Sequence, residues 1–304
     1  MEQRHARMLV SAGRAVGSLT LASLAWLATL AALASLATVG CAAPVQRAAA
    51  VPAAHAQGEE RIMASFPPIE FVSARDAIVR IVGAGNVTCT GTLIADDLVL
   101  TAHHCIAARD KKGHVVESNM APEDLQIELG RDELPWGEVR VRAIVAPQCG
   151  YVQGEGDIAI LVLTRHLVGM PTSVAHLESP PKASDIVTVF GFGRCALSSD
   201  GIKLRARGDT KIEAVASGHF EATASICPGD SGGPVYDSQR NLVGVVSASV
   251  MDGDETTADK SLFTRIDTWP QLFAAAHEIS DGASPGELPP YGECPKPPAR
   301  KSGR

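Results

Sequence analysis

Short apolar segments, separated by clusters of glycine, proline, asparagine and aspartate, follow one another between residues 62 and 279. They are rich in β-branched residues. The segments occupy residues 77–82, 98–102, 126–129, 138–145, 158–163, 185–190 and 242–247, with a further strand position at Val235. Many short strands divided by turn residues are typical of a sandwich or a barrel. The pattern therefore predicts an all-β domain.

One segment near the carboxyl end follows a helical period instead. Apolar residues recur along one face of residues 269–279. They are Trp269, Leu272, Phe273, Ala276 and Ile279. Beyond the helix, residues 281–304 are rich in proline and glycine, and we interpret them as a disordered tail pinned by Cys294.

The amino-terminal residues predict export. Arginines in the first 14 positions precede an apolar, uncharged stretch at residues 16–39, as in a signal peptide; the stretch is also long enough for an uncleaved membrane anchor. Its end resembles a bacterial lipoprotein signal, which would lipidate Cys41. Ordinary cleavage, after Ala43 or at residues 54–56, is the alternative. Residues 42–61 then form a linker or propeptide. We expect an extracellular, periplasmic or outer-surface protein that contacts a membrane only through this lipid or anchor.

Composition narrows the function classes. Hydrophobic residues make up 45% of the 304 positions, enough for a buried core. The net charge of −7 argues against nucleic-acid binding, which needs a basic surface. There are seven cysteines, and export favours disulfides; lipidation of Cys41 would leave an even number. No His/Cys cluster has zinc-like spacing, so we expect neither a metal nor a cofactor.

Two segments carry the strongest chemical signal: CPGDSGGP at residues 227–234 and TAHHC at residues 101–105. A serine hydroxyl becomes a good nucleophile when a neighbouring imidazole takes its proton. Glycines let the backbone turn sharply and bring two N–H groups toward a reacting carbonyl oxygen. Together the segments predict a serine hydrolase.

Four motifs resemble those of trypsin/chymotrypsin-like serine proteases, over residues 62–280. They are CTGTLI at 89–94, VLTAHHC at 99–105, DIAIL at 157–161 and GDSGGP at 229–234, in the family's order of histidine, aspartate and serine. The resemblance implies two six-stranded antiparallel β-barrels with a C-terminal helix. It also implies a serine endopeptidase that cleaves polypeptides through an acyl-enzyme, since the general mechanism for such a triad is the one described for this same family.

The resemblance assigns three catalytic residues. The family's base directly precedes the cysteine, which selects His104, and an unperturbed imidazole titrates near neutrality. His103 fills a position usually held by alanine, and we interpret it as a packing substitution. Asp157 would orient His104, with Glu155 as the alternative acid, and Ser231 would be the nucleophile.

The same resemblance extends to the oxyanion hole and to activation. The backbone N–H groups of Gly229 and Ser231 would bind the oxyanion. In relatives, the aspartate at the position of Asp230 pairs with an amino terminus freed by cleavage. Cleavage between Arg61 and Ile62 by an activating protease would supply that amine; a form that stays uncleaved is the alternative.

Cysteine pairing follows in part from the resemblance, which implies a disulfide bracing the histidine loop. The other pairings are an inference from loop position and elimination, because connectivity cannot be deduced from sequence alone. The expected pairs are Cys89–Cys105, Cys195–Cys227 and Cys149–Cys294.

Four serines match positions that line the substrate cleft in the family. Ser247 would support the aspartate, Ser225 would lie at the base of the primary pocket, and Ser249 and Ser261 would form its walls. No carboxylate stands at the base, so a preference for arginine or lysine is not supported. We expect a small or medium uncharged residue before the scissile bond, and we interpret the acidic loop at residues 252–259 as solvated surface.

Two other interpretations compete with this assignment. The serine motif also fits the G-x-S-x-G elbow of α/β-hydrolases, but that fold needs a downstream histidine and alternating strands and helices. Only His277 follows Ser231, within the predicted helix, so we reject this fold. A catalytically impaired trypsin-fold module that acts as a tethered binding protein is the second alternative, which His103 leaves open.

Overall fold

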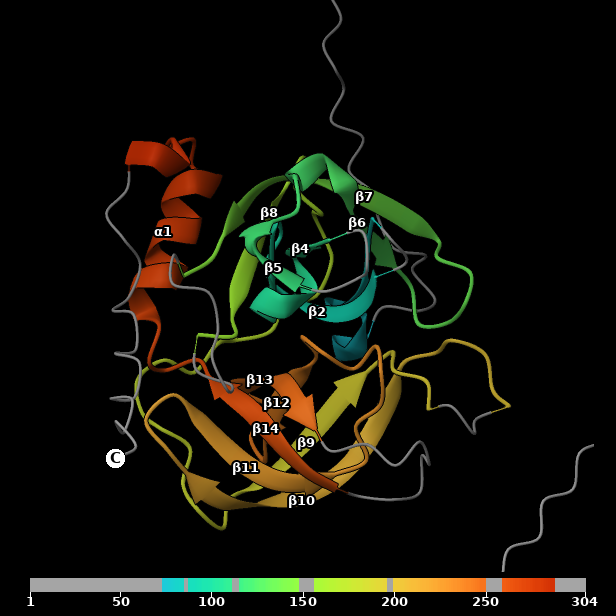
Figure 1. Cartoon of the computed structure of the whole chain (residues 1–304), viewed down its shortest axis with the longest axis vertical. Coiled ribbons are helices and arrows are strands. Elements are labelled where there is room, and N and C mark those ends of the chain that lie inside the picture. Colours follow the sequence, from blue (N-terminus) through green and yellow to red (C-terminus); the bar gives the residue numbers. More distant parts are fainter. Residues whose placement is uncertain are drawn as a thin grey trace, which may run out of the picture. The chain divides into compact units, whose positions relative to one another are not determined.

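The computed structural model describes residues 73–84, 87–110, 115–147, 156–195, 199–249 and 259–287 (Figure 1). Several sequence predictions lie outside these ranges. They are the export signal with Cys41, the linker at residues 42–61, the Arg61–Ile62 junction, the alternative acid Glu155, the Cys149–Cys294 pair, most of the acidic loop and most of the tail.

Six strands close the first antiparallel barrel in the order β1-β2-β3-β8-β7-β6. Their bounds are β1 Ile78–Gly83, β2 Val87–Ala95, β3 Leu98–Thr101, β6 Leu125–Leu129, β7 Gly137–Val145 and β8 Ala159–Leu163. Alternate side chains of β6 are buried, as expected for a strand with one face on a core. Strands β4 (Ala107–Arg109) and β5 (Val115–Asn119) form a separate two-stranded sheet.

The second antiparallel barrel closes in the order β10-β11-β14-β13-β12-β9. Its strands are β9 Ile186–Gly191, β10 Arg205–Val215, β11 His219–Ala224, β12 Pro234–Asp237, β13 Leu242–Ser249 and β14 Asp259–Arg265. The rings of Phe220 and Phe263 stack in its interior with centroids 5.2 Å apart. Figure 1 shows this barrel, in yellow to orange, below the cyan to green first barrel.

Helix α1 (Pro270–Ser280) follows the second barrel in sequence but packs on the first. Its buried face, which includes Leu272 and Ile279, contacts β8, β7 and β3. Arg142 of β7 donates from Nη2 to the carbonyl oxygens of Ile279 and Ser280, both at 3.0 Å, and so satisfies carbonyls at the end of the helix that lack partners within it.

None of the helices in the described ranges has the length and apolar character needed to span a bilayer.

The predicted fold class is confirmed: two six-stranded antiparallel barrels and one C-terminal α-helix. Each predicted apolar segment overlaps a strand of the structure, and α1 begins one residue later than its predicted span. The apolar pattern did not reveal β2 of the first barrel, β10, β11 and β14 of the second barrel, or the short strands β4 and β5.

Candidate active site

His104 lies on a short 3₁₀ turn, His103–Cys105, that directly follows β3. The Cys89–Cys105 disulfide joins this turn to β2. The turn is therefore held by the barrel on one side through its own strand and on the other through a covalent bond, which limits the directions in which the imidazole can point.

Asp157 binds His104 twice. Its Oδ2 is 2.8 Å from His104 Nδ1, and its Oδ1 accepts the His104 backbone N–H at 2.9 Å. The residue is only 1% exposed. Burial alone would raise the pKa of Asp157, but the charge and hydrogen bonds of His104, together with the bond from Ser247, lower it below its ordinary value. The ionised carboxylate is thus placed to hold a proton on Nδ1 and leave Nε2 as the basic nitrogen.

The second barrel completes the support of this carboxylate. The hydroxyl of Ser247 on β13 donates to Asp157 Oδ2 at 2.5 Å. The hydroxyl of Thr264 on β14 donates to the Asp157 backbone carbonyl at 3.0 Å. The role of Ser247 was expected from the sequence, whereas Thr264 was missed because a threonine in a strand carries no signal of its own.

The glycine-rich turn brings Ser231 to the same region. Thr90 of β2 donates its backbone N–H to the Ser231 carbonyl at 2.8 Å, so the turn of the second barrel is bonded to the first. A side chain on Gly232, the next residue, would meet Thr101 Oγ1 at 2.1 Å and Ala102 N at 3.0 Å, just before the histidine turn. No hydrogen bond joins the Ser231 hydroxyl to His104 in the described ranges; such bonds are often long until substrate binds.

Thr90 is a second residue that sequence reasoning missed. Its buried hydroxyl donates to the carbonyl oxygen of Gly229 at 2.7 Å and accepts the backbone N–H of Phe192 at 3.0 Å. One side chain therefore joins the serine turn to the loop after β9. Its place beside Cys89 in the CTGTLI motif was the available signal.

The peptide that carries the Gly229 N–H is fixed from its other side. The backbone N–H of Arg194 donates to the Pro228 carbonyl oxygen at 3.0 Å. In a trans peptide the N–H points away from the C=O of the same unit, so this bond directs the Gly229 N–H to the opposite side. Gly229 has a φ of 103°, a backbone conformation that glycine adopts without strain.

Asp230 has a charged partner within the described chain, which is Arg207. Its carboxylate is fully buried and pairs with Arg207 of β10, whose Nε lies 2.7 Å from Oδ2. Ile62, the predicted source of the partner amine, lies outside the described residues. Burial raises the pKa of Asp230, and the Arg207 charge with the N–H donors of Cys227 and Gly193 opposes that rise.

A second disulfide, Cys195–Cys227, ties the loop after β9 to the start of the serine turn. The loop that bears Gly193 and Arg194 is therefore covalently linked to the segment it supports. This is the pairing that the sequence suggested from loop position.

The serines matched to the primary pocket lie together at the ends of β11, β13 and β14. Ser249 and Ser261 are opposite each other in the β13–β14 pairing, with hydroxyl oxygens 2.8 Å apart. Ser261 also donates to the Ala224 carbonyl at 3.4 Å, a long contact beside the partly buried Ser225. The hydroxyl groups at the predicted walls of the pocket therefore hydrogen-bond to one another.

His103 is buried, and it makes a hydrogen bond in addition to packing against its neighbours. It is 4% exposed, and its Nε2 lies 2.8 Å from Asn119 Oδ1 on β5. Burial lowers the pKa of His103, while Asn119 and the charge of Asp157 oppose the shift. This bond links the histidine turn to the β4–β5 sheet. Nothing in the sequence indicated that Asn119 would be the partner of His103.

This environment predicts a pH-dependent stability. Below about pH 6.5 the unfolded chain protonates His103 while the folded chain keeps it neutral until its lowered pKa is reached, so the free energy of unfolding should fall as pH drops through that window. The slope for one proton is at most about 1.4 kcal/mol per pH unit. Urea unfolding at several pH values should show that the free energy of unfolding depends less steeply on pH in His103→Gln. A separate activity assay should show that this variant keeps most of its turnover.

His166→Gln is the control, because it should change the pH dependence of the free energy of unfolding in the opposite direction. The hydrogen bond that His166 Nδ1 donates to the Asp96 carboxylate raises the pKa of His166. This exposed group therefore favours the folded state at low pH, and its removal should steepen the loss of stability. An unchanged slope in His103→Gln would show that the buried imidazole does not titrate as described.

Two groups of side chains in the described ranges are close enough together to suggest metal ligands. In the first, Cys89 and Cys105 are bonded to each other beside His104, so their sulfurs are not thiolates. In the second, Asp96 pairs with His166 at 2.9 Å and Asp97 accepts the Ser280 hydroxyl at 2.7 Å. The side chains of both groups therefore already have partners within the chain.

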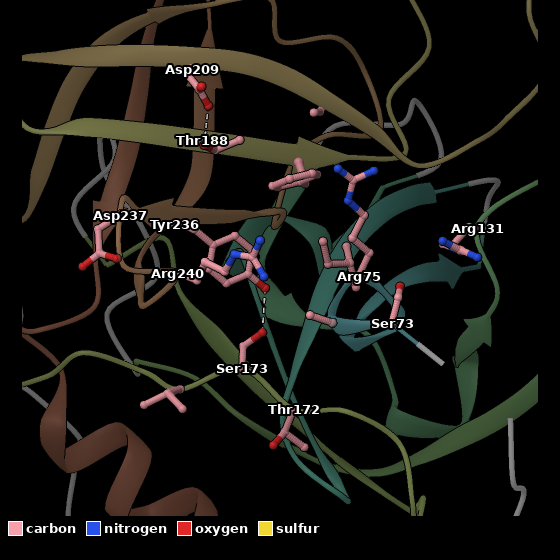
Figure 2. A pocket seen from close by; sticks show the side chains of 15 residues that line it. Ser73, Arg75, Arg131, Thr172, Ser173, Thr188, Asp209, Tyr236, Asp237 and Arg240 are labelled. Atoms are coloured by element: carbon pink, nitrogen blue, oxygen red, sulfur yellow. Dashed lines mark hydrogen bonds between the residues drawn. The ribbon is translucent and has the colours of Figure 1, made fainter. Parts of the chain in front are cut away.

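A large hollow of about 740 Å³ lies away from the catalytic groups, between the start of the described chain and strands β9, β10 and β12 (Figure 2). Arg75 lies over the Phe190 ring at 5.4 Å, and Tyr236 bonds to Ser173 at 2.6 Å. Burial raises the pKa of Tyr236 to about 12. None of the predicted site residues lines this hollow, so its size does not bear on the catalytic assignment.

Comparison with known proteins gives consistent matches. A family model described as Trypsin matches residues 57–270. The vitellin-degrading protease of Bombyx mori is 27% identical over 198 residues, which cover 56% of this chain and 69% of the relative. Granzyme B(G,H) of Mus musculus is 25% identical over 203 residues, covering 60% and 76%.

Among solved structures, a Glu endopeptidase in complex with MPD matches with a TM-score of 0.54 and 17% identity. The match covers 69% of this chain and 93% of that chain. At this identity the likeness concerns the fold alone.

Proposed function

Because this chain belongs to the trypsin family, we propose that it is a serine endopeptidase that uses His104, Asp157 and Ser231. The observation that chiefly supports this is the doubly bonded His104–Asp157 pair, with 2.8 Å between Nδ1 and Oδ2. This pair lies in a fold of two six-stranded barrels, and the glycine-rich turn that carries Ser231 is hydrogen-bonded to the first barrel.

In the acylation step, Ser231 Oγ forms a bond to the scissile carbonyl carbon and its proton passes to His104 Nε2. The carbonyl oxygen becomes an oxyanion, which the N–H groups of Gly229 and Ser231 stabilise. When the C–N bond breaks, His104 returns the proton to the leaving amine. Asp157 stays ionised and stabilises the imidazolium.

Deacylation repeats the sequence with water. His104 takes a proton from the water molecule as its oxygen attacks the acyl carbon, and the ester bond to Ser231 then breaks. The proton returns to Ser231 Oγ and the carboxylic acid product leaves. Water is consumed once per peptide bond, and no other co-reactant is required.

A serine-reactive probe tests the proposal directly. The mature wild-type protein should be labelled by a biotinylated fluorophosphonate at Ser231, and Ser231→Ala should not be labelled, because the attacking oxygen is gone. Mass spectrometry of the labelled peptide reads the site. Ser238→Ala, a change at an exposed serine after β12, is the matched control and should label like wild type.

The outcomes separate the two functions. Labelling that persists in Ser231→Ala would refute this nucleophile. A folded wild-type protein that does not react would favour the alternative of a trypsin-fold binding module.

We propose a small or medium uncharged residue before the scissile bond. The hydroxyl-lined walls formed by Ser249 and Ser261, without a carboxylate at Ser225, support this preference. A set of peptides that differ only at this residue measures it, and faster cleavage after arginine or lysine would contradict it.

We propose that the protein acts outside the cytoplasm. The two disulfides and the fold are consistent with an extracellular protein. Anchoring through Cys41 stays a prediction, and the mass of the mature amino terminus would measure it.

A further inference from the structure

The carboxylate of Asp230 is enclosed by groups of this chain. Arg207 approaches it with two nitrogens: Nε forms an ion-pair contact at 2.7 Å from Oδ2, outside hydrogen-bond geometry, and Nη2 donates to Oδ1 at 3.1 Å. The N–H groups of Gly193 and Cys227 donate at 2.7 and 2.8 Å. Since a carboxylate offers about four acceptor positions, these contacts fill both oxygens.

The residues around the Asp230 carboxylate lie too close to it to leave room for another charged group. A side chain on Gly191 or Gly193 would lie within 2.5 Å of the Asp230 carboxylate. Arg207 itself is only 3% exposed in its side chain, and its Nη2 also donates to the Gly193 carbonyl. A buried guanidinium needs such a partner, and removal of one member of a buried pair is strongly destabilising.

This ion pair acts on the groups predicted to bind the oxyanion. Arg207 and Arg205 of β10 both donate to the Gly193 carbonyl, the latter at 3.1 Å, and Gly193 precedes Arg194, whose N–H orients the peptide of Gly229. Asp230 in turn precedes Ser231. The pair therefore fixes the backbone on both sides of the predicted oxyanion hole.

We infer that Arg207 is a positioning residue that supplies internally the cation which fixes Asp230, so that the oxyanion hole forms without an amine freed by cleavage before Ile62. This inference rests on the proposed protease function. The protein would then be active in its uncleaved form, and the Arg61–Ile62 junction would not control activity.

The alkaline pH profile distinguishes the two cations. An α-amine loses its proton near pH 8, a lysine ammonium near pH 10, and a guanidinium stays charged throughout the range a protein tolerates. Arg205 on β10, which donates to the same Gly193 carbonyl, is also a guanidinium group, and it pairs with the Asp200 carboxylate, which also binds Lys203. The serine turn adds only Asp230, and the Cys195–Cys227 disulfide does not titrate.

The experiment compares fluorophosphonate labelling rates of the full-length protein between pH 7 and 10.5 for wild type, Arg61→Gln, Arg207→Lys and Arg207→Met. Wild type and Arg61→Gln should react alike, within about twofold, with no loss on the alkaline side. Arg207→Met should react about 10²-fold more slowly, the scale of one lost oxyanion donor. Arg207→Lys should recover part of the rate and lose it again near about pH 10.

The results show whether the oxyanion hole forms without cleavage before Ile62. Mass spectrometry establishes whether Arg61→Gln is uncut. Loss of labelling in that uncut variant, or a wild-type fall near about pH 8 to 9 without unfolding, would overturn the inference. If Arg207→Met does not fold, the comparison of wild type with Arg61→Gln decides alone. Absence of labelling in wild type at every pH would instead count against the proposed function.

Discussion

Asp157→Asn is expected to lower kcat by about 10⁴-fold, the loss known for this change in the family's best-described triad. The carboxylate accepts three hydrogens: the His104 backbone N–H at Oδ1, and His104 Nδ1–H with Ser247 Oγ–H at Oδ2. An amide has one acceptor oxygen. If its NH₂ faces Nδ1, the imidazole must carry its proton on Nε2 and can no longer accept one from Ser231.

The opposite amide orientation is also unfavourable, because the NH₂ would then face the His104 backbone N–H, donor against donor. Steady-state kinetics on a peptide ester measures the effect. Ser247→Ala is the matched control: it removes one donor and leaves both His104 bonds, so we expect a loss of about tenfold, the scale of one hydrogen bond. Retention of activity within tenfold in Asp157→Asn would show that Asp157 does not set the tautomer.

Gly232→Ala should destabilise the fold by about 3 kcal/mol or more and abolish probe labelling. The added Cβ would meet Thr101 Oγ1 at 2.1 Å and the Thr90 carbonyl at 2.3 Å. The Thr90 carbonyl belongs to β2 and cannot move without disturbing the barrel. The glycine also has a φ of 80°, which costs any other residue further energy.

Gly208→Ala separates these two costs. Gly208 has nearly the same φ, 83°, but a Cβ there would meet nothing within 4 Å. It should lose only the roughly 1–2 kcal/mol of a left-handed alanine and keep its labelling. Thermal and urea unfolding measure both variants. Equal destabilisation of the two would mean that close packing of the serine turn on β2 contributes nothing.

The fold class was accessible from the sequence because many strands of the two barrels are short apolar runs between turn residues. Strand β10 was not accessible in this way, because only Arg207 and Ile212 of its residues are buried and a shift in register interrupts its pairing. A buried arginine in a strand cannot be told from a surface one by composition. Its partner Asp230 is distant in sequence, and only folding brings them together.

The candidate catalytic residues followed from motifs, but the residues that hold them in place did not. Thr264, Thr90 and Asn119 act through hydrogen bonds to groups that are distant in the sequence. A hydroxyl or amide in a strand has many possible partners, and the sequence does not choose among them. The buried position of His103 was expected, whereas its bond to the β4–β5 sheet was visible only in three dimensions.

Helix α1 follows every strand of the described chain yet covers part of the first barrel. Synthesis on the ribosome therefore delivers the histidine, the aspartate and the serine before the segment that finishes the core around the first two. A nascent or truncated polypeptide ending before Pro270 would leave β8 and β7 uncovered. We therefore expect a copy that ends before Pro270 to lack a complete first barrel, and with it part of the support for His104 and Asp157.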